Sequence, residues 1–142
     1  MKGKASWPLF WALIAVFVVV MVGLLFTPPF IPAFIGPVFL WFLIIFGSIF
    51  LLLGVALIVL TVREKVEGKL KAFFLLTGAS AAGFFVSFIL HNAVYGLFIH
   101  FFGAGFWGGG DEPFFFIMAV FVCPLGFLVG AIGSIVLRVR KS

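Results

Sequence analysis

Four long apolar runs alternate with short polar, proline-rich or glycine-rich segments along the chain. The runs cover about residues 7–26, 38–62, 72–101 and 113–137. A helix rises about 1.5 Å per residue, so each run is long enough to cross a hydrocarbon core about 30 Å thick. We therefore predict an all-α integral membrane protein, a single domain over residues 1–142 in which four transmembrane helices form an antiparallel bundle. Ser6, a residue type that favours helix N-caps, precedes the first run.

The segments between the runs predict where the helices begin and end. Thr27–Pro37 holds four of the seven prolines, which remove backbone donors and end a helix. Before the fourth run, Asp111 and Glu112 precede Pro113, which is the typical order of a carboxylate cap and an early proline at a helix start. The third run has about 30 residues, or ~45 Å as a helix, so its far end must tilt, break near Gly96 or protrude.

Composition indicates which solvent covers these runs. The chain is 65% hydrophobic and 9% charged, whereas a soluble domain carries about 25% charged residues to wet its surface. Most of the surface is therefore expected to face lipid. Cys123 is the single cysteine, which excludes a disulfide or a thiolate metal cage within one chain.

The positive charges gather in three places that an arrangement of four spans brings to one side of the membrane. They are Lys2, Lys4, Arg63, Lys65, Lys69, Lys71, Arg138, Arg140 and Lys141. The positive-inside rule makes that side cytoplasmic, so we expect both termini in the cytoplasm and the protein in a plasma or inner membrane. Anionic lipid headgroups are a sufficient partner for these cations, and nucleic acid is not needed to explain them.

The fourth run carries a stripe of small residues at helical spacing. The stripe consists of Ala119, Cys123, Gly126, Gly130 and Gly133. Such spacing lets helix backbones approach closely in lipid, either within the bundle or between copies or partner subunits. Pro124 removes a backbone donor near the middle of the same run and predicts a kink there.

The third run holds a group of polar side chains near its outer end. Ser87, His91 and Tyr95 share one helical face, and Asn92 points about 100° away from His91. An ionisable residue at membrane depth indicates a functional site, so we predict a ligand site formed by Ser87, His91, Asn92 and Tyr95. The alternative is that a neutral His91 hydrogen-bonds a neighbouring helix or Tyr95.

A metal site on the outer side is a further hypothesis. Its ligands would be His91, His100, Asp111 and Glu112, because imidazole and carboxylate suit zinc or a similar ion. The two histidines are nine residues apart and point to opposite faces of a continuous helix, so only a break near Gly96 or a second subunit would join them. The sequence identifies no cofactor. A haem held by two histidines would need them on facing helices, and only the third run has histidine.

The chain lacks the sequence motifs of common catalytic and nucleotide-binding sites. Close-packing faces are plentiful, so a non-enzymatic interaction or assembly subunit of a membrane complex, or a homo-oligomer, is the first functional hypothesis. The second is a binder or conduit for a small or lipidic ligand at the outer leaflet, around His91, Asn92 and Tyr95. The third is a metal-dependent membrane enzyme on the outer side.

Overall fold

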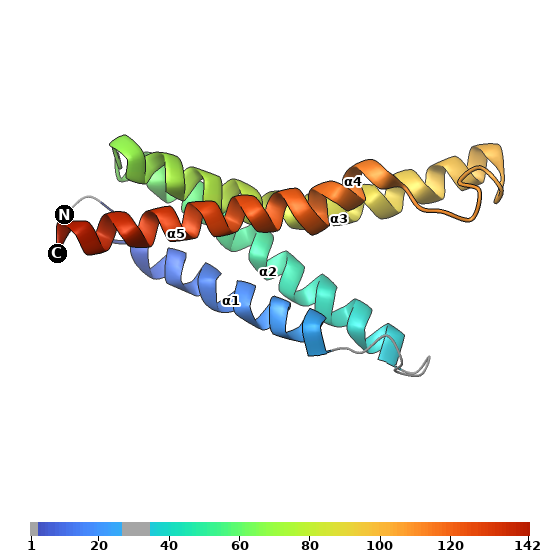
Figure 1. Ribbon diagram of the computed structural model, residues 1–142, viewed down its shortest axis with the longest axis horizontal. Helices are drawn as coiled ribbons and strands as arrows, with labels where there is room; N and C mark the ends of the chain where they lie inside the picture. Colours follow the sequence, from blue (N-terminus) through green and yellow to red (C-terminus); the bar gives the residue numbers. More distant parts are fainter. Residues whose placement is uncertain (1–2, 27–34) are drawn as a thin grey trace.

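The computed structural model describes residues 3–26 and 35–142, which are mostly helical and contain no strand. The elements are α1 (Ser6–Phe26), α2 (Ile35–Arg63), α3 (Gly68–Phe102), α4 (Pro113–Ile117), the π-helical segment η1 (Met118–Val122) and α5 (Cys123–Lys141). The segments α4, η1 and α5 follow one another without interruption and form one long rod (Figure 1). Most of the predicted proline-rich segment, residues 27–34, lies outside the described residues.

Four helices in the described ranges are long and apolar enough to cross a membrane, as the sequence predicts. Each predicted run lies within one of them, counting α4, η1 and α5 as a single helix. The third does not break at Gly96, because α3 continues for 35 residues, about 52 Å at the usual helical rise. It ends at Gly103, where φ is 90° and the backbone amide donates to the Ile99 carbonyl at 2.9 Å. A positive φ of this kind favours glycine.

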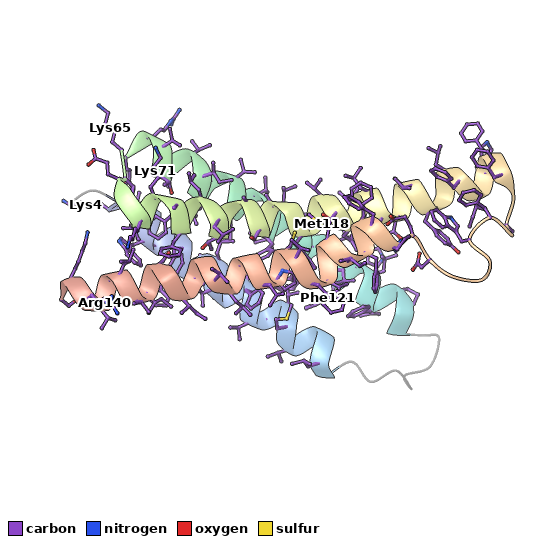
Figure 2. All side chains as sticks on the ribbon, turned by 45° about the horizontal axis from the view of Figure 1, so that its top comes forward. Lys4, Lys65, Lys71, Met118, Phe121 and Arg140 are labelled. Atoms are coloured by element: carbon purple, nitrogen blue, oxygen red, sulfur yellow. The ribbon has the colours of Figure 1, made fainter. Side chains whose placement is uncertain are left out.

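The start of α1 and the C-terminal end of α5 lie at the same end of the molecule, together with the turn between α2 and α3 (Figure 1). We call this the basic end, because Lys4, Lys65, Lys71 and Arg140 lie there (Figure 2). A cation–π contact joins α5 to α1 at this end: the Arg138 guanidinium lies 4.4 Å above the ring of Trp7, at the start of α1. The opposite end, where the α3–α4 loop (residues 103–112) lies, we call the distal end (Figure 1).

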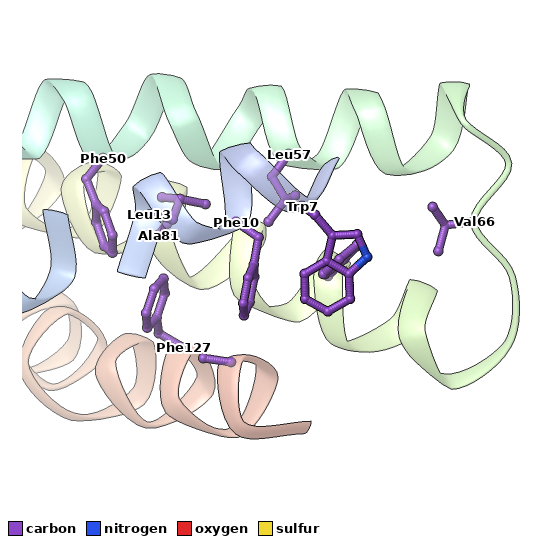
Figure 3. Close-up of a cluster of buried hydrophobic side chains, with 10 residues drawn as sticks. Trp7, Phe10, Leu13, Phe50, Leu57, Val66, Ala81 and Phe127 are labelled. Atoms are coloured by element: carbon purple, nitrogen blue, oxygen red, sulfur yellow. The ribbon is translucent and has the colours of Figure 1, made fainter. Parts of the chain in front are cut away.

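The hydrophobic core lies in the half of the bundle nearer the basic end (Figure 3). Its buried residues are Trp7, Phe10, Leu13, Phe50, Leu57, Val66, Phe74, Ala81, Phe127 and Ala131. On its distal side Phe17 of α1 stacks on Phe127 of α5, with ring centroids 4.4 Å apart. Beyond this contact α1 and α5 diverge (Figure 1). The distal half therefore has a less complete core.

Glycines set the distance between α5 and α3. Gly126 faces Ser80, Gly130 faces Thr77 and Gly133 faces Phe73, and a methyl group at any of the three would overlap with these neighbours. The backbones of α2 and α3 also meet closely, at Gly54 and Gly78. Three members of the predicted small-residue stripe thus pack against another helix of the same chain.

Candidate functional site

A histidine and two carboxylates meet where α3 passes the start of α4. The Nδ1 atom of His91 lies 3.2 Å from Oε2 of Glu112, and its Nε2 atom lies 3.4 Å from Oδ1 of Asp111. The side chains of His91 and Glu112 are 14% and 4% exposed, whereas that of Asp111 is 57% exposed. We call these three residues the His91 cluster.

The local sequence explains why Glu112 is held in place. Its carboxylate accepts hydrogen bonds from the backbone amides of Phe114, at 2.7 Å, and Phe115, at 3.0 Å. Pro113 takes the first helical position, so its missing amide costs nothing there. Asp111 in turn accepts the amide of Glu112 at 2.8 Å. The predicted carboxylate cap is therefore present, and it also joins α4 to α3 through His91.

The His91 cluster carries net negative charge in either state of the histidine. An imidazolium donates from both ring nitrogens, so it would satisfy both carboxylates at once, whereas a neutral imidazole donates from one. Two carboxylates beside an imidazolium leave one negative charge, and beside a neutral imidazole they leave two. No lysine or arginine occurs between residues 72 and 137, so the compensating cations are at the basic end.

A cavity of about 520 Å³ lies beside the His91 cluster, between α1–α2 and the α3–α5 pair. Aromatic rings of α3 and α4 form one wall: Phe84, Phe85, Phe88 and Phe116. Met21 of α1 and Leu43 of α2 contribute the other wall. The polar residues that line the cavity are His91 and Asn92, which follow the phenylalanines toward the distal end of α3.

The widened backbone of η1 forms part of the cavity lining, through Ala119 and Val120. Pro124 has no amide to donate one turn back, and its ring crowds the Val120 carbonyl. The chain adopts a π turn just before it, in which the amide of Cys123 donates to the carbonyl of Met118, five residues earlier. The sequence predicts a disturbance of the helix at Pro124, and the disturbance takes the form of this π turn.

The predicted ligand residues separate into two pairs. His91 and Asn92 line the cavity. Ser87 is buried in α3 and does not line the cavity. Tyr95 stacks on Trp107 of the distal loop, with ring centroids 6.0 Å apart, and its carbonyl accepts the Trp107 indole N–H at 3.2 Å. Tyr95 therefore positions the loop.

The four residues of the metal hypothesis do not converge as a set. His91 meets Asp111 and Glu112, but α3 stays helical through Gly96, so His100 lies nine residues further along and exposed. Its ring packs edge-on against Phe101, with centroids 5.3 Å apart. Within the described ranges, no group of three or more His, Cys, Asp or Glu side chains is arranged to hold a metal ion.

Comparison of the chain with protein-family models, with curated proteins and with solved structures gives no match. The fold and the cavity are the features from which a function is inferred.

Proposed function

We propose that this small polytopic membrane protein binds a lipid-like amphiphile in the cavity beside the His91 cluster. One hydrocarbon chain of the ligand packs along Phe84 and Phe88, and its polar head lies beside His91 and Asn92. The observation that carries the proposal is an apolar cavity of about 520 Å³ whose polar lining is confined to one end. This volume is within the usual range of about 300–1,000 Å³ for small-molecule sites.

The way into the cavity supports a ligand that arrives through the bilayer. Phe116 and Val120 line the cavity and are also 43% and 46% exposed on the surface of the molecule. In a membrane this surface faces acyl chains, so an apolar molecule enters without crossing water. A stacked aromatic wall offers a large contact area to a hydrocarbon chain.

The charge distribution supports one orientation in the membrane. We propose that the four helices cross in alternating directions with the basic end in the cytoplasm, because all nine lysines and arginines occur in the sequence before α1, around the α2–α3 turn or at the end of α5. The polar end of the cavity then opens at the outer leaflet of a plasma or inner membrane.

The assembly hypothesis rests on helix faces that suit close packing. In the structure, α3 already covers the glycines of α5, so these faces support packing within one chain. A role as a subunit of a larger complex is a separate prediction. Contact with lipid is sufficient to explain the exposed apolar surface.

The proposal is tested by photolabelling in liposomes with a long-chain alcohol that carries a diazirine in mid-chain. We expect saturable adducts on the α3 segment that contains Phe84 and Phe88, located by mass spectrometry. Leu43→Trp adds an indole to the cavity wall and should abolish most of this saturable labelling. Ile45→Trp, two residues along α2 on a 54% exposed position, adds the same ring toward lipid and should leave it unchanged.

Labelling spread evenly over the lipid-facing helices, with no saturable part, would overturn the proposal. Equal effects of Leu43→Trp and Ile45→Trp would do so as well, because they would show that the cavity plays no part.

A further inference from the structure

At the polar end of the cavity, some hydrogen-bonding groups are already paired within the protein and others are not. Both ring nitrogens of His91 face carboxylates of the protein, at 3.2 Å and 3.4 Å. The amide nitrogen of Asn92 donates to the Phe88 carbonyl of its own helix at 2.8 Å. The Asn92 amide keeps its oxygen and its second N–H for a ligand. The 57% exposed carboxylate of Asp111 does not line the cavity but lies just beyond it, in contact with His91.

The charge at this end of the cavity is negative, which favours a positively charged ligand head. The His91 cluster is net negative, and the sequence places no lysine or arginine between residues 72 and 137 to offset it. At the edge of the hydrocarbon, where the effective dielectric constant is lower than in water, such a charge attracts a cation and repels an anion more strongly than it would in bulk solvent.

We infer that the polar head of the ligand is a protonated amine on a single hydrocarbon chain. This inference rests on the proposed function and names the chemical class of its ligand. The chain lies in the aromatic part of the cavity, and the ammonium group passes His91 to donate to Asp111 and to the Asn92 amide oxygen. A carboxylate or phosphate head would lie beside the net negative His91 cluster with one spare side-chain donor, the second N–H of Asn92, to meet it.

The experiment uses the diazirine alcohol as a reporter and competes it with three molecules of the same chain length. These are hexadecylamine, hexadecanol and hexadecanoate, added to the full-length protein in liposomes of neutral lipid. We expect the amine to displace the reporter at a concentration roughly 10- to 100-fold lower than the alcohol, as a hydrogen bond to a charged group implies. The carboxylate should be the weakest competitor.

Asp111→Asn should remove most of the preference for the amine while the alcohol still competes, which shows that the cavity is intact. The matched control is Glu67→Gln, which removes one negative charge at the basic end and should preserve the preference. If Asp111→Asn binds neither molecule, the competition of the three molecules on the wild-type protein decides the amine inference by itself.

The outcomes separate the two proposals. Equal competition by amine and alcohol, or stronger competition by the carboxylate, would overturn the amine inference and leave the binding function standing. Failure of all three to displace the reporter would overturn both.

Discussion

Two carboxylates each accept backbone amides at the start of a helix, Glu64 at α1 and Glu112 at α4. At the basic end, Glu64 accepts the backbone amides of Ala5, at 2.7 Å, and Ser6, at 3.0 Å, and also the Ser6 hydroxyl. Ser6 was expected to cap α1 with its own side chain, but a carboxylate from the end of α2 satisfies these donors instead. At the distal end Glu112 caps α4 and meets His91. Each carboxylate thus joins helices as well as completing one.

The Glu64 contact makes a prediction about pH. Hydrogen bonding from the Ser6 hydroxyl, reinforced by the two amides and opposed by partial burial, lowers the pKa of Glu64 below its ordinary value of 4.5. Because the pKa is lower in the folded state, the contact stabilises the fold above pH 4.5, and this contribution is lost as pH falls through the lowered pKa.

The measurement is the thermal unfolding midpoint of wild type and Glu64→Gln in detergent, from about pH 7 down to about pH 3. We expect the wild type to be more stable at neutral pH and the two midpoints to converge in acid. A gap that stays constant across this range would show that the Glu64 charge does not contribute.

At the scale of helices, close glycine contacts decide how α5 lies on α3. The hydrogen of Gly130 points at the side chain and backbone of Thr77 and at the carbonyl of Phe73. Rigid backbone cannot move aside as the end of a flexible side chain can. Gly96, by contrast, has open space around it on the exposed part of α3.

Alanine at the two positions should therefore have opposite effects. Gly130→Ala forces α3 and α5 apart and should destabilise the fold by about 1–3 kcal/mol. Gly96→Ala should stabilise it by about 0.5–1 kcal/mol, because alanine loses less backbone freedom in a helix interior. Reversible unfolding in mixed micelles compares the two, and equal destabilisation would contradict the α3–α5 contact.

At this scale the sequence predicts those features that are set by residues close together in the chain. The apolar runs and the cap formed by Asp111, Glu112 and Pro113 are local patterns, and the helices follow them. Pro124 predicts an irregularity in the helix, but whether it takes the form of a π turn depends on the side chains that pack around it. Tyr95 shares a helical face with His91, yet its ring follows Trp107 in a glycine-rich loop whose path no local pattern gives.

The cavity is a property of the whole molecule. Met21 and Leu43 line it because α1 and α2 diverge from the α3–α5 pair, and neither residue carries a signal of that in its own segment. Its polar end was foreseen through His91 and Asn92, since polar residues are rare in an apolar run. Its aromatic wall was not predicted, because the chain has 23 phenylalanines and nothing in the sequence distinguishes the four that line the cavity.

Charge divides the whole molecule into two ends. In the sequence, all lysines and arginines come before α1, around the turn between α2 and α3, or at the end of α5, whereas Asp111 and Glu112 belong to the distal loop. This asymmetry predicts that the two ends lie on opposite sides of one membrane, with the cavity opening away from the cytoplasm. The binding site and the amine inference both depend on that placement.

Cysteine accessibility in intact cells measures the placement. Lys65→Cys marks the turn between α2 and α3, and Gly105→Cys marks the distal loop, each in a Cys123→Ala background that removes the buried native thiol. We predict that a membrane-impermeant maleimide labels Gly105→Cys in intact cells and Lys65→Cys only after permeabilisation. Labelling of both positions in intact cells, or of neither before permeabilisation, would place the two ends in one compartment and contradict the four-span arrangement.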